Sequence, residues 1–311
     1  MDVVGIPGKP VERRGCVNAD SETHSLSSVL WGHIRLARIS NLPTVITNVA
    51  AGAALADALW GEAFSPLALL VLSLAMALFY TAGMYLNDYV DYGVDCRERP
   101  ERPLPTGVIS RKTALRFVIG YFVVGLLLVA YARLWALIPG VVLVGVIVLY
   151  DCWHKNNPLS HWTMALARSL VYVTVFVALG GTDITYLLIA ALLMLLYVAG
   201  LTYIARSETG SDFRRYWPIL LLLLPAAYFW WQTRGLFLLV PVAFAMWCGW
   251  SLWFVYRGKN KSIGDGIVRL IAGIALLDAM VLVAGGFGFL AAAAVCMFML
   301  TRSLQGFVAG G

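Results

Sequence analysis

Apolar runs long enough to cross a bilayer recur along this chain from residue 40 onward. Nine are clear and a tenth follows: residues 40–58, 65–86, 113–131, 134–150, 163–180, 184–205, 216–231, 235–256 and 267–284, then 287–303. The hydrocarbon core of a membrane is about 30 Å thick and takes roughly 20 apolar helical residues to cross. The runs do not alternate in hydropathy as barrel strands do. The pattern therefore predicts an all-α, multi-pass membrane protein with nine core transmembrane helices, or ten if the last run also crosses.

The composition agrees with a membrane protein, because 60% of the residues are hydrophobic and 13% are charged, against about 25% charged in soluble domains. The first 28 residues differ, since they hold several charges and no apolar segment of the signal-peptide kind. We expect residues 1–28 to form a cytosolic N-terminal tail and residues 29–305 to form one membrane domain. Residues 26–39 mix apolar and polar positions, which predicts a helix lying in the membrane interface.

The basic residues are distributed unevenly, and the net charge is +6. Most of those in the membrane domain fall in loops predicted on one side, while the opposite loops hold Arg133 and Arg234. The positive-inside rule places the basic side in the cytosol. Because topology accounts for these charges, we expect no nucleic-acid partner. The five cysteines occur singly and without a CxxC pair, so the sequence predicts neither a zinc site nor a disulfide framework.

A polar segment directly after the 65–86 run contains Asn87, Asp88, Asp91 and Asp95. Residues four apart share a face of a helix, so Asn87, Asp91 and Asp95 form one stripe of oxygen ligands with Asp88 on its flank. Carboxylates at this spacing destabilise a helix by roughly 0.2–0.5 kcal/mol unless a cation compensates them. Mg²⁺ suits the stripe, because it takes one or two carboxylates and completes its shell with water and phosphate. The alternative is a solvated acidic loop.

A second acidic motif lies 117 residues further on, where Glu208 matches Asp91 and Asp212 matches Asp95. The motifs follow the second and sixth apolar runs, which predicts a pseudo-repeat of four-helix units with a site between the halves. Two facing acidic turns would hold two Mg²⁺ ions, which would bind a diphosphate and make it a leaving group. The candidate catalytic residues are Asp88, Asp91, Asp95, Glu208 and Asp212, and the candidate metal ligands are Asn87, Asp91, Asp95, Glu208 and Asp212.

Basic side chains near these motifs are candidates for binding the diphosphate, because guanidinium groups meet phosphate oxygens in pairs. The candidates are Arg38, Arg97, Arg102, Lys155 and Arg168. Ordinary positive-inside charge is the alternative for the loop arginines. Arg168 and Asp278 fall inside apolar runs, where charged groups are costly and face a cavity or a partner. Arg168 therefore faces the cavity or snorkels to the interface, and Asp278 has either a structural partner or a catalytic role.

Tyrosines recur near the predicted cytosolic helix ends, where the default interpretation is the aromatic belt of the membrane interface. The alternative is a ring face that stabilises a carbocation in the cavity. Tyr85 and Tyr203 are the candidates for contact with a prenyl group.

Residues 87–95 and 99–107 together resemble the first signature of the UbiA superfamily of intramembrane prenyltransferases. They read Asn-Asp-x-x-Asp-x-x-x-Asp and Arg-Pro-Glu-Arg-Pro-Leu-Pro-Thr-Gly. The resemblance covers residues 40–303 and implies Mg²⁺ and a prenyl diphosphate, with Arg38 as the family's first-helix basic residue and Lys155 as the one after the fourth helix. The second motif departs from the family's usual Asp-x-x-x-Asp, because it begins with Glu208. Residues 150–158 and 203–206 resemble the divergent UbiA-like proteins of ebo gene clusters.

With that resemblance, the sequence predicts a Mg²⁺-dependent prenyltransferase with its helices around a central cavity. It would move a prenyl group from a prenyl diphosphate to an unidentified acceptor, at a mouth facing the cytosol. The alternative is a terpene cyclase on the same scaffold, in which the cation closes on its own double bonds. A proton- or cation-coupled transporter using Asp278 ranks lower. So does a CDP-alcohol phosphotransferase, whose motif needs glycine where Tyr92 follows Asp91.

Overall fold

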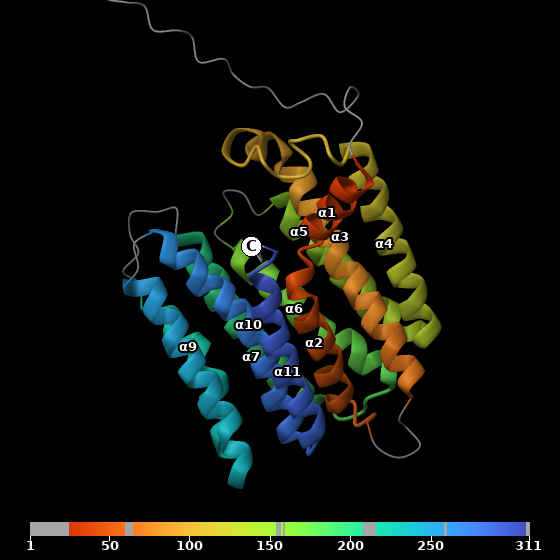
Figure 1. Ribbon diagram of the computed structural model, residues 1–311. Helices are drawn as coiled ribbons and strands as arrows, with labels where there is room; N and C mark the ends of the chain where they lie inside the picture. The colour runs from red at the N-terminus through yellow and green to blue at the C-terminus, as the bar shows by residue number, and fades with distance from the viewer. Residues whose placement is uncertain are drawn as a thin grey trace, which may run out of the picture.

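The computed structural model describes residues 25–59, 65–153, 157, 159–207, 216–257 and 260–308, and all of their regular secondary structure is helical (Figure 1). The α-helices are α1 Leu26–Leu36, α2 Leu42–Leu55, α3 Pro66–Glu98, α4 Arg111–Ala132, α5 Leu137–Trp153, α6 Ser160–Leu179, α7 Ile184–Ser207, α8 Trp217–Gln232, α9 Leu239–Arg257, α10 Asn260–Ala284 and α11 Gly288–Gln305. Three 3₁₀ turns, η1 Ile39–Asn41, η3 Leu134–Ala136 and η4 Gly235–Leu238, precede α2, α5 and α9. The predicted all-α class is confirmed.

Eight helices in the described part of the chain are long and apolar enough to span a membrane, and α11 is one of them. Two shorter apolar helices, Ile39–Leu55 and Trp217–Gln232, accompany them. The protein is therefore a multi-pass integral membrane protein, although the predicted count of nine spans is not confirmed. The segment before α2 forms the short helix α1, as the mixed pattern of residues 26–39 predicts.

Local chemistry explains where several helices begin and end. The hydroxyls of Ser25, Ser65 and Ser110 accept hydrogen bonds from the first turns of α1, α3 and α4, which satisfies amide groups that have no partner within the helix. Helix α6 ends at Gly180, whose φ of 79° is the left-handed conformation that glycine adopts without a Cβ clash. These caps set the helix ends independently of the membrane boundaries.

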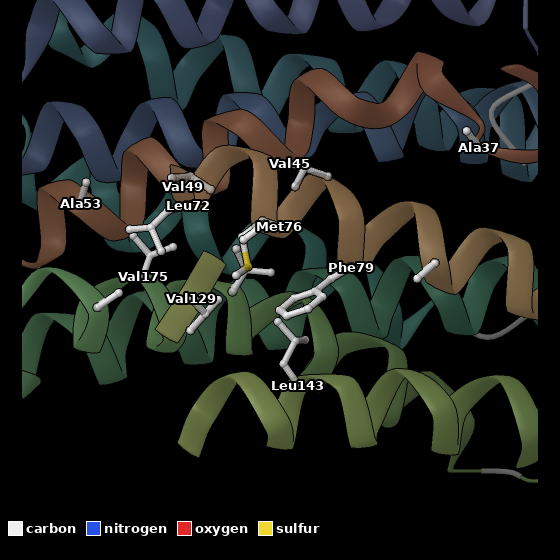
Figure 2. Close-up of a cluster of buried hydrophobic side chains, with 14 of the residues drawn as sticks. Ala37, Val45, Val49, Ala53, Leu72, Met76, Phe79, Val129, Leu143 and Val175 are labelled. Atoms are coloured by element: carbon white, nitrogen blue, oxygen red, sulfur yellow. The ribbon is translucent and has the colours of Figure 1, made fainter. Parts of the chain in front are cut away.

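Helix α10 lies at the centre of the bundle, because 72% of its apolar window is buried, against 22% for α11 and 28% for α4, α5 and α9. One apolar cluster fills the space between α2, α3, α5 and α6, with Val45, Met76, Phe79 and Leu143 among its members (Figure 2). Helices α3 and α4 approach closely there, since a Cβ on Gly125 would lie 2.5 Å from the Phe79 ring. Small residues allow such close packing in membranes, where dispersion contacts drive helix association.

The helices alternate in direction, so α3, α5, α7, α9 and α11 finish at the same end of the bundle where α2, α4, α6, α8 and α10 begin (Figure 1). This end, which we call the site end, receives the acidic C-terminal turns of α3. Helix α1 and the segment between α3 and α4 also lie there. The fold therefore gathers the predicted polar residues at one surface of an apolar bundle.

One cysteine differs from its sequence-based prediction. Cys96, near the end of α3, is disulfide-bonded, which the single spacing of the cysteines did not predict. Cys152, Cys248 and Cys296 are free thiols. Cysteine spacing along the chain did not reveal the pairing, because a disulfide depends on which segments the fold brings together.

Candidate active site

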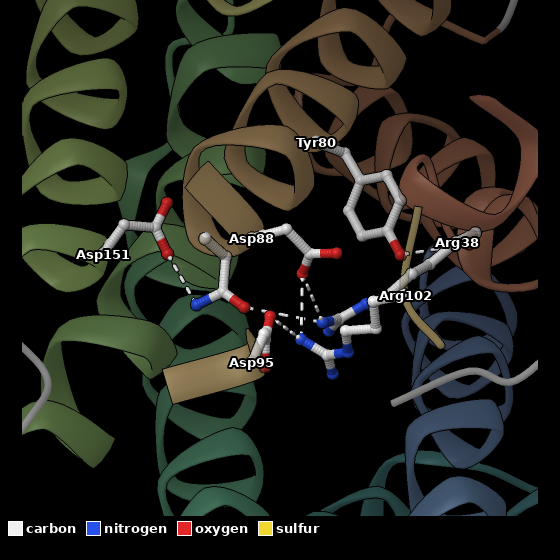
Figure 3. A network of polar contacts seen from close by, with 7 residues as sticks. Arg38, Tyr80, Asp88, Asp95, Arg102 and Asp151 are labelled. Atoms are coloured by element: carbon white, nitrogen blue, oxygen red, sulfur yellow. Dashed lines mark hydrogen bonds and ion pairs between the residues drawn. The ribbon is translucent and has the colours of Figure 1, made fainter. Parts of the chain in front are cut away.

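The last turns of α3 place the first acidic motif against two arginines (Figure 3). Arg102 Nη1 lies 2.8 Å from Asp95 Oδ2 and 3.2 Å from Asp88 Oδ1. Arg38 Nη2 lies 3.3 Å from the same Asp88 oxygen. Asp88 and Asp95 are 5% and 4% exposed, so solvent screens these ion pairs less than it screens surface pairs. One carboxylate of the motif thus holds two guanidinium groups from different parts of the chain.

Arg38 reaches the motif because the chain bends sharply between α1 and η1. Its backbone is left-handed, with φ 43° and ψ 51°, and such a conformation costs roughly 1–3 kcal/mol unless surrounding contacts enforce it. The Tyr80 hydroxyl in α3 donates to the Arg38 carbonyl oxygen at 3.2 Å. The Arg38 guanidinium also donates to Asn87 Oδ1 at 3.4 Å. These contacts hold the bend in place and direct the side chain to the motif.

Arg102 reaches the motif because the segment between α3 and α4 folds back over the end of α3. Leu104 and Ile109, at 3% and 2% exposed, anchor this segment in the core. The Arg102 amide donates to the Arg99 carbonyl, and Gly107 completes the turn with a φ of 75°. The proline-rich sequence, which disfavours a helix, therefore forms a fixed structure that presents Arg102.

Asp151, in the last turn of α5, joins the site although it is absent from the predicted site residues. Asn87 Nδ2 donates to Asp151 Oδ1 at 3.3 Å, and Asp151 is 2% exposed. The two helices approach closely here, because a Cβ on Gly83 would lie 3.0 Å from Ile147 Cγ2. The available signal was an acid in the last turn of an apolar run, where a carboxylate is costly without a function or a partner.

Two adjoining cavities extend from this network into the bundle. The larger has a volume of about 520 Å³ and the smaller about 80 Å³. Both are lined by Tyr80, Met84, Tyr150, Met164 and Arg168. These five residues form a shared wall, so the two cavities are direct neighbours.

The cavities differ in chemistry. The larger cavity has three arginines on its wall, Arg38, Arg99 and Arg168, together with one acid, Asp265. The rest of the smaller cavity is lined by Gly83, by one acid, Asp151, and by apolar side chains. The apolar residues are Val45, Met76, Phe79, Leu143, Ile147, Ala167 and Val171. A cationic space therefore adjoins an apolar pocket inside the membrane domain.

Arg168 faces this space and does not snorkel to the interface. Its guanidinium lines both cavities, and Nη2 donates to Thr44 Oγ1 at 2.5 Å. Asp91 is half-buried on α3, between Asp88 and Asp95, the two acids that contact the arginines. Of the two alternatives for Arg168, the structure favours the one in which it lines the cavity.

Arg97 and Tyr85 lie elsewhere. Arg97 is exposed, and its Nε donates back to the Gly93 carbonyl of its own helix at 3.2 Å. The Tyr85 hydroxyl lies 2.6 Å from His33 Nδ1, and its ring packs toward α1 and α4. Burial lowers the pKa of the His33 imidazole below its usual value, which favours the neutral ring in this hydrogen bond. Tyr85 is absent from the lining of both cavities, because its side of α3 packs against α1 and α4.

Tyr203 also lies outside the cavity lining, with its ring 4.6 Å from Trp217 and 5.6 Å from His161, measured between centroids. Tyr80 and Tyr150 occupy the cavity wall instead, and periodicity alone did not distinguish them. Three further candidates, Lys155, Glu208 and Asp212, fall outside the described residues. The second metal motif and the repeat built on it remain predictions.

Asp278 is fully buried and has three hydrogen-bond donors. Thr47 Oγ1 and Asn48 Nδ2 of α2 donate at 2.5 and 2.7 Å, and the Tyr172 hydroxyl of α6 donates at 2.5 Å. Asp278 itself belongs to α10, so the carboxylate joins three helices. This arrangement favours the structural reading of Asp278 over a site for transported cations.

The donor set at the motif suits Mg²⁺, because Asn87, Asp91 and Asp95 offer only oxygen ligands. Within the described part of the chain, no three His, Cys, Asp or Glu side chains form a group that would hold a metal by itself. Arg102 and Arg38 instead occupy the carboxylates. Mg²⁺ does not need an all-protein cage, since it commonly binds through one or two carboxylates and substrate phosphates. The residues therefore fit an ion that binds together with a diphosphate.

The described helices surround a polar site of aspartates and arginines that adjoins an apolar pocket, inside a multi-pass membrane protein. The pattern of the UbiA prenyltransferase family matches residues 45–266. This chain belongs to that family, and the predicted superfamily is confirmed. The ebo branch is not singled out by the match and stays a prediction.

Relatives with known names support the same family. The digeranylgeranylglyceryl phosphate synthase of Thermococcus kodakarensis is 37% identical over 101 residues, 32% of this chain and 36% of that protein. The enzyme of that name from Methanoregula boonei is 31% identical over 139 residues, 44% and 46% of the two chains. The matched region thus spans less than half the length of these relatives.

Solved structures show the same fold over nearly their whole length. A structure of a digeranylgeranylglyceryl phosphate synthase in membranes matches with a TM-score of 0.60 and 18% identity, covering 83% of this chain and 98% of that one. An apo UbiA homologue from Aeropyrum pernix K1 gives a TM-score of 0.60 and 18% identity, covering 79% and 97%. At this identity the likeness establishes the fold alone.

Proposed function

We propose that this protein transfers a prenyl group from a prenyl diphosphate to a lipid acceptor, in a Mg²⁺-dependent reaction inside the membrane. One observation carries the proposal. Arg38 belongs both to the ion-pair network and to the cationic cavity, and Asp151 belongs both to the network and to the apolar pocket. A prenyl diphosphate would match this arrangement, because it consists of a charged diphosphate head and an apolar chain.

The diphosphate end would bind at the network. Arg38 and Arg102 would release the carboxylates of the motif and bind phosphate oxygens instead. The planar guanidinium group matches the geometry of both anions. Asn87, Asp91 and Asp95 would hold Mg²⁺, with Glu208 and Asp212 as the expected ligands of a second ion. The metal would neutralise the diphosphate and improve it as a leaving group. The arginines add fixed positive charge where the leaving group develops negative charge.

The prenyl chain would lie in the apolar pocket between Met76, Phe79 and Leu143. The reaction breaks the allylic C–O bond, and the diphosphate leaves with the bonding electrons. Tyr80 and Tyr150 line both cavities, and their rings would stabilise the remaining carbocation. A nucleophilic oxygen of the acceptor then bonds to that carbon, and its proton passes to the departed diphosphate. Apolar walls keep water from taking the acceptor's place.

The names of the relatives suggest where to begin with the acceptor. Digeranylgeranylglyceryl phosphate synthases are named for a product that carries two geranylgeranyl groups on a glyceryl phosphate. A glyceryl phosphate that already carries one such group is therefore the first acceptor to test. The positive-inside distribution further supports a site mouth that faces the cytosol.

The test uses purified full-length protein with Mg²⁺ and labelled geranyl, farnesyl and geranylgeranyl diphosphates. Each is incubated with and without geranylgeranylglyceryl phosphate or a lipid extract. A labelled product that requires an added lipid, and that disappears with a chelator, is the expected result. A hydrocarbon formed without acceptor would establish the cyclase instead. Failure to consume any prenyl diphosphate in the presence of Mg²⁺ would overturn both.

A further inference from the structure

A third cavity lies outside the proposed active site, in a groove where α9 and α11 pack against α10. Its volume is about 520 Å³, and it shares no lining residue with the two cavities above. Leu239, Trp250 and Met299 on its walls are 65%, 51% and 59% exposed. In a multi-pass membrane protein such an exposed apolar surface faces lipid. We call this feature the α9–α11 groove.

Two arginines, Arg269 of α10 and Arg302 of α11, line the α9–α11 groove among its apolar side chains. Buried Nε and Nη1 atoms of Arg269 have no hydrogen-bond partner among the described residues. Its guanidinium instead lies 4.5 Å from the Trp250 ring centroid and 4.0 Å from that of Phe254. Stacking on aromatic faces orients a guanidinium but does not satisfy its N–H groups.

Arg302 also has no contacting carboxylate among the residues that the structure describes. Its Nη1 donates to Gln305 Oε1 at 2.6 Å, and its guanidinium lies 5.8 Å from the Trp247 ring centroid. The ion pairs within the described chain are those at the acidic motif, and neither Arg269 nor Arg302 takes part in them. Asp265 acts on Arg302 from a longer distance, and its side chain lines the larger cavity. The groove therefore carries two positive charges without a contacting anion.

Both arginines lie toward the site end of their helices. Arg269 is nine residues from the start of α10, or about 13 Å along the helix, and Arg302 is three residues from the end of α11. Both ends belong to the site end of the bundle. Trp247 and Trp250 beside them are of the residue type that concentrates at membrane interfaces. Toward the opposite end the groove becomes apolar, with Val240 and Leu276 on its walls.

We propose that the α9–α11 groove binds an anionic phospholipid from the leaflet at the site end. Its phosphate contacts Arg269 and Arg302, and one of its chains lies along the apolar part of the groove. The anion supplies the acceptors that Arg269 lacks and reduces repulsion between the two guanidinium groups. Basic pockets between transmembrane helices are established binding places for anionic headgroups. A soluble anion would use the arginines alone and leave the lipid-facing groove unexplained.

The experiment is a titration of purified full-length protein in detergent, with native mass spectrometry counting bound lipid. The probes are dioleoyl phosphatidylglycerol and dioleoyl phosphatidylcholine, which share their chains and differ in net charge. The variants are Arg269→Met, Arg302→Met and their combination. Arg234→Met is the matched control, because Arg234 lies at the opposite end and donates to the Trp231 and Thr233 carbonyls.

The parent protein should bind phosphatidylglycerol more tightly than phosphatidylcholine. Each arginine removed should weaken phosphatidylglycerol binding by roughly fivefold, with phosphatidylcholine binding and the control unchanged. Arg269→Lys should keep most of the preference for phosphatidylglycerol over phosphatidylcholine. This variant provides a second test if Arg269→Met does not fold. Excess inorganic phosphate should not displace the lipid. Equal binding of the two lipids, a preference that survives in the double variant, or displacement by inorganic phosphate would each overturn the proposal.

Discussion

The side-chain amide of Asn87 donates a 3.3 Å hydrogen bond to the carboxylate of Asp151, which joins α3 to α5 beneath the acidic motif. Because its Nδ2 is held in this way, the Oδ1 of Asn87 faces Arg38. Asn87 is a candidate metal ligand, and a partner that orients a ligand affects metal affinity without touching the metal. Asp151 is therefore a positioning residue in the proposed enzyme.

The first prediction follows from that contact. Asp151→Leu should raise the Mg²⁺ concentration for half-maximal activity by roughly 10- to 100-fold, the usual cost of losing such a partner. Asp151→Asn should have a smaller effect, because its side-chain oxygen still accepts from Asn87. The measurement is activity against Mg²⁺ concentration at saturating prenyl diphosphate. If Asp151→Leu keeps the parent's Mg²⁺ dependence, the contact does not orient a ligand.

A second prediction separates Arg97, in the last turn of α3, from Arg102, in the segment after α3. Arg102→Met should raise the KM for prenyl diphosphate roughly 10- to 100-fold, because charge-assisted hydrogen bonds contribute about 1.5–3 kcal/mol each. Arg102→Lys should recover part of this, since it keeps the charge without the planar fork. Arg97→Met should leave KM unchanged, because the exposed Arg97 side chain donates back to the Gly93 carbonyl of its own helix. Equal increases in KM at both positions would mean that positive charge near the site, rather than direct contact, determines substrate binding.

Much of the fold could be predicted from the sequence, because lipid imposes a simple rule on backbone hydrogen bonding. Only helices and closed barrels satisfy it, so apolar runs of the right length identify helices. The ends were less accurate. The apolar run ends at residue 86, whereas α3 continues to Glu98. A helix can extend past the membrane because its backbone hydrogen bonds do not require apolar side chains. Hydropathy therefore identifies the part of α3 that crosses the membrane, but not the last turns of the helix, which carry the acidic motif.

The candidate site could be predicted only in part. Spacing along one helix predicts the stripe Asn87, Asp91 and Asp95, since that relationship is local. The contact with Asp151 depends on the packing of α3 against α5 at Gly83, and the contact with Arg38 depends on a left-handed backbone at that arginine. Neither leaves a periodic signal in the sequence.

Asp278 provides a third prediction, on stability rather than turnover. Asp278→Leu removes the acceptor of three hydrogen bonds that join α2, α6 and α10. At an average of about 0.6 kcal/mol for a hydrogen bond in a membrane protein, the loss is roughly 2 kcal/mol. The melting temperature in detergent should fall, while kcat per folded molecule stays near the parent value. An unchanged melting temperature with abolished turnover would instead assign Asp278 a catalytic role.

A fourth prediction concerns orientation in the membrane. Cys152 is a free, exposed thiol at the site end of α5, whereas Cys248 is buried. In oriented vesicles of a variant that keeps Cys152 as its only cysteine, an impermeant maleimide should react only when added from the cytosolic side. Cys96 is unsuitable for this test because it is disulfide-bonded. Reaction from the outer side alone would invert the topology and place the site mouth there.

The last prediction tests whether the two acidic motifs act as one clamp on a diphosphate. Asp91→Asn and Glu208→Gln keep side-chain size and hydrogen bonding but remove the charge. If the acids hold metal ions against the same diphosphate, each variant should lower turnover by orders of magnitude and raise the Mg²⁺ requirement. The double variant should be little worse than either single one, because groups that act as a unit are not additive.

Glu208→Asp sharpens the same test, since it restores the family's usual acid while shortening the side chain by one methylene, or about 1.5 Å. Mg²⁺ tolerates little change from its ligand distance of about 2.0–2.1 Å, so partial activity, clearly above that of Glu208→Gln, is the expected result. Full activity of Glu208→Gln would show that the second motif holds no metal. The repeat would then carry no function, and one ion held by Asn87, Asp91 and Asp95 would have to bind the diphosphate, with Arg38 and Arg102 supplying the remaining positive charge.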